Sequence, residues 1–145
     1  MSIFAASRRL PTALSSSRLA TRSFASTSRK LERFENADVN VFKKRVMDEG
    51  SSKLMIVDFY AAWCGPCRML SPLLEKLTTD TTLTNGKEVD LMTVDVDKQT
   101  QLAGMFQVTS LPTVIIFKDK KAVQRFVGFI PMPKLQQIVA EAADI

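Results

Sequence analysis

Two cysteines, Cys64 and Cys67, stand three positions apart and are the only cysteines among the 145 residues. Two thiols at this spacing can close into a small disulfide ring and open again as electrons pass. The chain contains no histidine, and two thiols alone cannot complete the ligand set of a structural zinc ion. The pair therefore predicts dithiol–disulfide exchange, with no metal ion and no bound cofactor.

Three other interpretations of the cysteine pair stay open at this point. The pair could be half of a zinc site shared with a partner, although such halves usually lie on turn-rich knuckles. A static structural disulfide would remove little chain entropy, because the loop that it closes is very short. Two incidental thiols would leave the neighbouring Trp63, Gly65 and Pro66 unexplained.

The two cysteines are expected to have different roles. Cys64 follows an apolar run over 54–60, typical of a strand covered on both faces, and a helical pattern begins near Cys67. The free N–H groups and the dipole at a helix start favour a thiolate, so we expect Cys64 to be the exposed nucleophile. Cys67 should be more buried and should resolve the mixed disulfide by attacking Cys64.

Asp58 places a carboxyl group inside this apolar run, six residues before Cys64. An aspartate is almost never fully buried without a partner. One interpretation puts Asp58 beneath the helix start with a raised pKa, as the acceptor of the Cys67 proton during resolution. The alternative makes the run an edge strand in which Asp58 faces water.

The elements that must position these residues follow one another after residue 30. Apolar patterning predicts strands near 31–34, 54–60, 89–96, 113–117 and 123–127. It predicts helices near 39–46, 67–81, 98–106 and 134–143, with a kink at Pro72 in the second. This order predicts an α/β fold with a parallel beginning, an antiparallel hairpin at the end and helices on both faces of the sheet.

The net charge of +5 does not indicate nucleic-acid binding, because its excess lies in the first 29 residues. Five of the 20 basic residues are arginines of this acid-free, serine-rich segment, and the other 15 balance the 15 acidic residues. Such a composition is typical of an organelle transit peptide over 1–29, with cleavage near Ala25; a disordered basic tail is the alternative. No segment approaches the roughly 20 apolar residues of a membrane-spanning helix.

Several motifs together resemble the thioredoxin family over about residues 31–145. They are Val57-Asp58-Phe59, Trp63-Cys64-Gly65-Pro66-Cys67, Pro72, Leu111-Pro112-Thr113 and Val127-Gly128, in the order and spacing of the family. The resemblance implies the thioredoxin fold, a central mixed β-sheet sandwiched between helices. It also implies a protein-disulfide reductase that cycles between a Cys64–Cys67 disulfide and the dithiol, supporting redox homeostasis and peroxide defence. The leader makes mitochondrial members of the family the most similar ones.

The resemblance further implies a substrate groove beside the cysteines. The Leu111-Pro112 bond should be cis, although the residues alone would favour an ordinary trans turn. Its loop should lie against Cys64 and keep metal ions away, and the backbone of Leu111 should pair with a substrate strand. The other residues that should border the groove are Trp63, Gly65, Pro66 and Gly128.

The resemblance also implies partners. The Gly65-Pro66 pair suits a reductant rather than an oxidant. An NADPH-dependent flavoprotein reductase should regenerate the dithiol, and peroxiredoxin-type enzymes are the expected clients. We expect the mitochondrial matrix as the location, because no membrane segment follows the cleavable leader, and we take a monomer as the default state. The alternative from another functional class is a redox-inert subunit that uses the same groove for docking.

Two positions depart from the pattern of the family. Thr93 stands where many members have a lysine that pairs with the buried aspartate, so the acid form of Asp58 should be more favoured. The predicted hairpin turn over 118–121 lacks the usual glycine. Asp119 can adopt a left-handed conformation there, so we expect a slightly strained turn.

Overall fold

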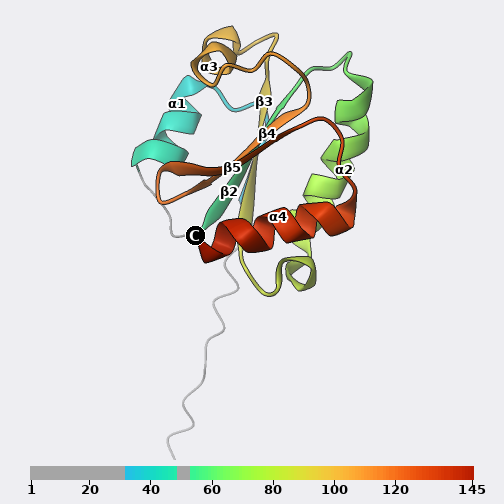
Figure 1. Ribbon diagram of the computed structural model, residues 1–145. Helices are drawn as coiled ribbons and strands as arrows, with labels where there is room; N and C mark the ends of the chain where they lie inside the picture. The colour runs from blue at the N-terminus through green and yellow to red at the C-terminus, as the bar shows by residue number, and fades with distance from the viewer. Residues whose placement is uncertain (1–31, 49–52) are drawn as a thin grey trace, which may run out of the picture.

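The computed structural model describes residues 32–48 and 53–145 (Figure 1). Over these residues five strands form one sheet in the order β1-β3-β2-β4-β5. The strands are β1 (Arg33–Phe34), β2 (Leu54–Tyr60), β3 (Val89–Asp95), β4 (Thr113–Lys118) and β5 (Lys121–Val127). Strand β3 runs parallel to β1 and β2, whereas β4 is antiparallel to β2 and β5. The predicted mixed sheet is confirmed.

Helices cover both faces of this sheet (Figure 1). On one face α2 (Gly65–Thr79) and α4 (Met132–Asp144) pack against the sheet. On the other face lie α1 (Val39–Phe42), the π-helix η1 (Lys43–Asp48) that continues it, and α3 (Thr100–Met105). A short 3-10 helix, η2 (Thr81–Thr84), follows α2 and was not predicted. None of the helices in the described part of the chain is long and apolar enough to cross a membrane.

Strand β2 lies in the middle of the sheet and is covered on both faces. Ile56 packs in the core on the α2 and α4 side, whereas Val57 and Phe59 pack on the other side. Because side chains alternate along a strand, Asp58 points to the same side as Ile56. Asp58 is only 1% exposed. The edge-strand interpretation is therefore wrong.

Helix α2 begins two residues earlier than predicted, directly after Cys64. Cys64 has an extended backbone and acts as the N-cap, since its Sγ accepts a hydrogen bond from the backbone N–H of Cys67 at 3.2 Å. Pro66 lies in the first turn, where a missing N–H costs nothing. Pro72 lies inside α2 without ending it.

Local turns account for two other boundaries. Helix α3 begins after the predicted residue 98 because the N–H groups of Lys98 and Gln99 both donate to the carbonyl of Asp95, which closes a separate turn. Strand β5 begins earlier than predicted because the turn before it is tight. Only Asp119 and Lys120 lie between β4 and β5, with φ of 50° and 68°.

Two consecutive left-handed residues are typical of a type I′ turn, whose twist matches that of a hairpin. This turn favours glycine at its second central position, which Lys120 occupies here. The strain expected at Asp119 is thus shared by Lys120. Each side chain in this conformation brings its Cβ close to a neighbouring carbonyl.

We predict that Lys120→Gly raises the free energy of unfolding by about 1 kcal/mol, because glycine adopts a positive φ without that clash. The change also removes an exposed hydrogen bond from Lys120 Nζ to the Asp48 carbonyl at 3.2 Å, a weak interaction. Urea unfolding of the variant measures the gain. The matched control is Lys121→Gly, which lies in β5 and should be destabilised. Equal effects of the two changes would contradict the turn argument.

Candidate redox active site

Cys64 and Cys67 form a disulfide at the start of α2, with their Cα atoms 5.3 Å apart. Cys64 is 4% exposed and Cys67 is 1% exposed. Cys64 is the more exposed of the two, as expected, but the expectation of an exposed Cys64 is wrong in this oxidised state, because both residues are buried. The partly buried side chains packed against the pair are Tyr60, Val96 and Leu111.

The start of α2 prepares Cys64 for negative charge. The N–H of Cys67 that donates to Cys64 Sγ would face a thiolate once the disulfide is reduced. A hydrogen bond to the ionised form and the positive end of the helix dipole both lower a thiol pKa. Cys67 lies one turn farther along α2 and lacks this position at the helix end.

The loop before β4 lies beside the disulfide. The Leu111-Pro112 bond is cis, as the resemblance implied, and Leu111 packs against the cysteines. The backbone N–H of Gly128 donates to the carbonyl of Pro112 at 2.8 Å. Gly128 has a φ of 89°, which side chains rarely permit. The structure thus brings Leu111, Pro112 and Gly128 together at the cysteine pair.

Trp63 is 69% exposed, and its indole Nε1 donates to Asp97 Oδ2 at 3.0 Å. This bond connects the segment before α2 to the segment after β3. Gly65 and Pro66 are also exposed at the start of α2. The sequence did not single out Asp97, because its only signal was a position just beyond a predicted strand.

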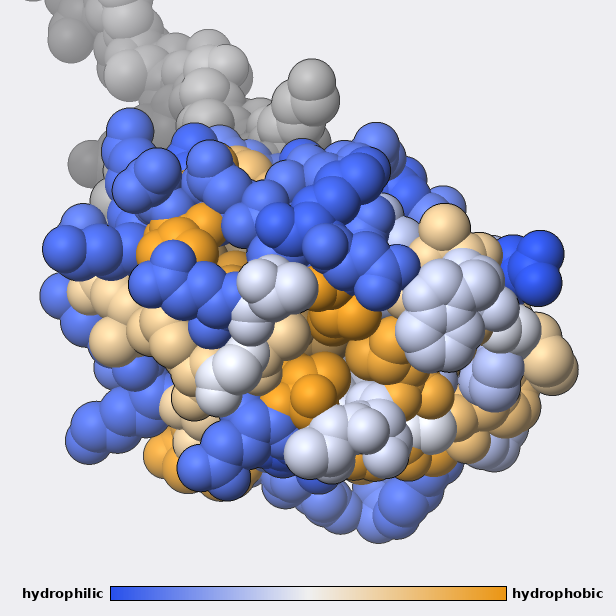
Figure 2. Space-filling model, turned by 90° about the horizontal axis from the view of Figure 1, so that it is seen from above, coloured by the Kyte–Doolittle hydropathy of each residue, from blue (hydrophilic) through white to orange (hydrophobic). Residues whose placement is uncertain are grey.

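Hydrophobic surface gathers at this end of the molecule. Large apolar side chains are exposed at Trp63, Met69, Met105, Val127 and Phe129. Figure 2 looks down on the end of the sheet where α3 and the start of α2 lie, and it shows hydrophobic surface bordered by hydrophilic residues. Exposed apolar surface of this kind is typical of a protein-binding site.

Asp58 lies in the core with both carboxyl oxygens buried and without a hydrogen-bond partner among the described residues. Burial raises its pKa from the ordinary 3.8 to about 7. The nearby Ser71 hydroxyl acts in the opposite direction, but it donates to the Cys67 carbonyl at 2.9 Å, so desolvation dominates. Asp58 can therefore take up and release a proton near neutral pH.

Thr93 is the neighbour of Asp58 on β3, in direct register with it. Its Oγ1 accepts a hydrogen bond from the N–H of Asn36 at 3.1 Å. A threonine brings no positive charge to the carboxylate, which agrees with the raised pKa of Asp58. The effect of Thr93 on the pKa of Asp58 stays a prediction.

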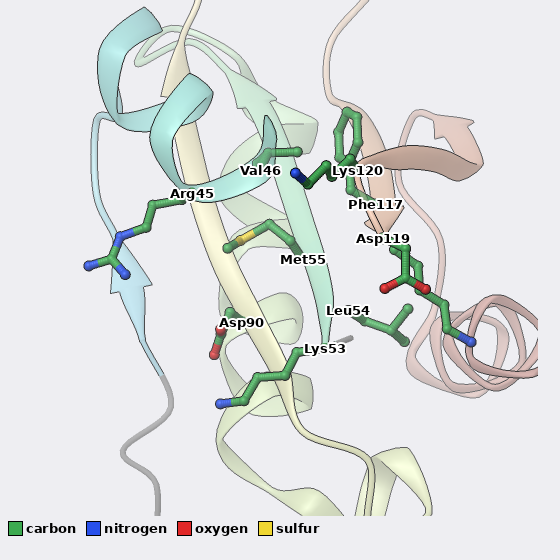
Figure 3. A pocket seen from close by; sticks show the side chains of 10 residues that line it. Arg45, Val46, Lys53, Leu54, Met55, Asp90, Phe117, Asp119 and Lys120 are labelled. Atoms are coloured by element: carbon green, nitrogen blue, oxygen red, sulfur yellow. The ribbon is translucent and has the colours of Figure 1, made fainter. Parts of the chain in front are cut away.

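A small pocket lies at the end of β2 that is far from the disulfide (Figure 3). It is bordered by the start of β2, at Lys53 and Leu54, and by the β4–β5 turn at Asp119 and Lys120. Its volume of about 20 Å³ is enough for roughly one water molecule. It is therefore too small to be a candidate substrate site.

Comparisons with known proteins agree with this geometry. A family model described as Thioredoxin matches residues 33–141, a range that contains both cysteines, Asp58 and Pro112. The chain is 40% identical to the thioredoxin of Staphylococcus saprophyticus over 103 residues, covering 71% of this chain and 95% of that protein. It is 43% identical to the thioredoxin of Staphylococcus haemolyticus over 88 residues, covering 61% of this chain and 81% of that protein.

Solved structures give the same result. The thioredoxin of Malassezia sympodialis matches with a TM-score of 0.65 and 32% identity, covering 79% of this chain and 93% of that one. The thioredoxin of Fasciola hepatica also matches with a TM-score of 0.65, at 34% identity, covering 75% of this chain and 98% of that one. The fold around the disulfide is therefore the thioredoxin fold.

The raised pKa of Asp58 makes stability depend on pH in a definite direction. Between about pH 4 and pH 7, folded Asp58 keeps a proton that the unfolded chain has lost. The free energy of unfolding is therefore highest below the unfolded pKa and falls as the pH rises through the folded pKa. At higher pH the folded state holds a buried carboxylate.

We predict that Asp58→Asn removes most of this pH dependence. At pH 8 the variant should be more stable than the unchanged protein by up to roughly 4 kcal/mol, with little difference below pH 4. Guanidinium unfolding of the oxidised proteins across this pH range measures the effect. A difference that stays constant with pH would show that Asp58 titrates normally in the folded state.

Proposed function

This chain belongs to the thioredoxin family and is a protein-disulfide reductase that uses the Cys64–Cys67 pair, and we propose that it acts in the mitochondrial matrix, in redox homeostasis and peroxide defence. The location is supported by the arginine-rich, acid-free composition of residues 1–29. That segment and its cleavage near Ala25 lie outside the described residues, as does residue 31 of the proposed 31–145 domain.

We assign the first chemical step to Cys64. Its thiolate attacks one sulfur of a substrate disulfide, and the other substrate sulfur leaves as a thiolate with the electron pair of the broken bond. A mixed disulfide then joins Cys64 to the substrate. The N-cap position of Cys64, with the Cys67 N–H directed at its sulfur, supports this assignment.

The second step belongs to Cys67 and Asp58. The Cys67 thiol gives its proton to the Asp58 carboxylate, and the resulting thiolate attacks Cys64 Sγ. The Cys64–Cys67 bond forms, and the remaining substrate sulfur leaves as a thiolate. A carboxyl group with a pKa of about 7 suits this transfer, because it is partly ionised near neutral pH and can accept the proton.

Substrates dock on the surface around the disulfide. Trp63, Gly65 and Pro66 border it on one side, and Leu111, Pro112 and Gly128 border it on the other. An extended substrate segment pairs with the backbone of Leu111. The contact of Leu111 with the cysteines and the exposed apolar surface support this placement, and Gly65 and Pro66 keep the pair reducing.

Members of the family generally work with a thioredoxin reductase and with protein disulfide substrates. For this chain the proposed reductase is an NADPH-dependent flavoprotein, which returns two electrons to the Cys64–Cys67 disulfide after each turnover. The proposed clients are peroxiredoxin-type enzymes, whose disulfides form as they reduce peroxide. The protein acts as a monomer in this scheme.

We predict that Cys67→Ser traps substrates on Cys64 as mixed disulfides, because the resolving thiol is gone while the attacking one remains. The matched control, Cys64→Ser, should trap almost nothing. Non-reducing electrophoresis of each variant with an oxidised peroxiredoxin measures the trapped species. Trapping confined to Cys64→Ser would reverse the assigned roles.

The same variants separate a reductase from a redox-inert docking subunit. The unchanged protein should reduce insulin disulfides faster than dithiothreitol alone does, and Cys64→Ser should lower the rate to that of dithiothreitol alone. Equal rates with and without Cys64 would support the docking subunit instead. The surface around the disulfide would then bind partners without exchanging electrons with them.

We predict that residues 1–29 direct import into mitochondria. The full chain should enter isolated mitochondria, resist added protease and acquire a new N-terminus near Ala25, as read by mass spectrometry. Deletion of residues 1–29 should abolish import while leaving insulin reduction intact. A control that replaces the five arginines by glutamine keeps the length but should also fail to enter. Import of the deleted chain would contradict the proposal.

A further inference from the structure

A polar pocket of about 180 Å³ lies on the face of the sheet that α2 covers. Its lining comes from β1 and the turn after it (Arg33, Asn36), from β2 (Tyr60), from α2 (Ser71, Glu75) and from β3 (Thr93). Arg33 and Asn36 are exposed, so the pocket opens to solvent. Its volume is several times what one water molecule requires.

Ser71 connects this pocket to the redox pair. It lies one turn after Cys67 in α2, and its hydroxyl donates to the Cys67 carbonyl at 2.9 Å. The same hydroxyl is close enough to Asp58 to act on its carboxyl group, and Ser71 also lines the pocket. One small side chain therefore bonds to the resolving cysteine, lowers the pKa of the proton acceptor and lines the pocket.

Thr93 lines the same pocket from β3. It pairs in register with Asp58, and both side chains point toward α2. Asp58 itself does not line the pocket, but its neighbours Ser71 and Thr93 do, and neither has a long side chain. Both instead offer hydroxyl groups, which can accept and donate a hydrogen bond in turn.

The charged groups at the pocket are already engaged with one another. Arg33 forms ion pairs with Glu35, at 3.3 Å, and with Glu75. Tyr60 donates its hydroxyl proton to Asn36 Oδ1 at 2.5 Å. Burial raises the pKa of Tyr60, with Asp95, Asp58 and Glu35 raising it further and Lys98 lowering it.

The register partners of Asp58 in the sheet are uncharged. On the β4 side its register partner is Val114, and on the β3 side it is Thr93; neither carries a charge. No arginine or lysine of the described residues contributes to its shifted pKa.

We propose that Ser71 is a positioning residue for Asp58. The Ser71 hydroxyl turns from the Cys67 carbonyl to the Asp58 carboxylate and links this carboxylate to the pocket. The proton leaves for solvent through the pocket. This inference rests on the proposed function of Asp58 as proton acceptor. Cys67 gives its proton to Asp58, and the Cys64–Cys67 bond then forms. Asp58 next releases the proton to water in the pocket and so to the buffer, which restores the carboxylate; no electrons move in this last step.

The test follows the Asp58 carboxyl group directly, by ¹³C NMR of protein labelled at aspartate, and separately times resolution of a mixed disulfide. In Ser71→Ala the pKa of Asp58 should rise, because a donor to the ionised form is lost. Proton exchange at Asp58, measured near that pKa, should slow about fivefold. Resolution of the mixed disulfide between about pH 7 and 8.5 should slow by about the same factor, which is the effect of one lost hydrogen bond.

Two variants serve as controls for the loss of a helix hydroxyl. Ser71→Thr keeps the hydroxyl and should restore both the titration and the rate. Thr79→Ala removes a similar bond within α2, from Thr79 Oγ1 to the Glu75 carbonyl at 2.8 Å, far from Asp58. It should leave both measurements unchanged. Thr93→Val removes the second hydroxyl group that lines the pocket beside Asp58, and should slow exchange while Ser71 is intact.

The outcomes separate the two claims. If Ser71→Ala behaves like Thr79→Ala in titration, exchange and resolution while Asp58→Asn slows resolution, the Ser71 inference is overturned and the role of Asp58 stands. If Asp58→Asn leaves resolution unchanged, the proposed function of Asp58 fails and the proton path fails with it. A raised pKa and slower exchange in Ser71→Ala, rescued by Ser71→Thr, support the inference.

Discussion

The burial of β2 on both faces and its pairing on both edges is the constraint on which the site depends. Apolar side chains such as Ile56 and Phe59 hold the strand in register with β3 and β4. Because strand side chains alternate, a slip of one residue would move Asp58 to the far face of the sheet, away from α2. The same strand ends at Tyr60, so its register also sets the position of Cys64 and the start of α2.

This arrangement places a titratable group where water cannot solvate its charge. Burial of an unpartnered carboxylate destabilises the folded state, and a leucine or asparagine in its place would avoid much of that penalty. The property that weakens the fold is the one that suits the chemistry, since a carboxyl group with a pKa of about 7 exchanges protons near neutral pH. Stability and function therefore make opposite demands on Asp58.

Much of the fold and the chemistry could be predicted because the informative signals are local. The alternating and continuous apolar runs located every strand, and the spacing of Cys64 and Cys67 indicated their reaction. The errors have local causes too. The tight turn at Asp119 and Lys120 lengthened β5, and the turn on the Asp95 carbonyl delayed α3. Neither turn contains the glycine that would have marked it in the sequence.

Residues that act through distant partners could not be found in the same way. The Trp63 indole donates a hydrogen bond to Asp97, 34 positions away in the sequence. Strand β3 likewise brings Thr93 beside Asp58, 35 positions away. No periodicity or spacing encodes such contacts, since they arise only when the chain folds.

The sequence by itself determined the reacting groups and the order of the elements, because apolar patterning and thiol spacing are properties of neighbouring residues. The burial of Asp58 was decided by the tertiary structure, which places β2 in the middle of the sheet. Only the tertiary structure decided how that carboxyl group is surrounded: unpartnered, beside Ser71 and next to a polar pocket that opens to solvent. The physical reason is that solvation and hydrogen bonding depend on which side chains from α2, β1 and β3 meet in space.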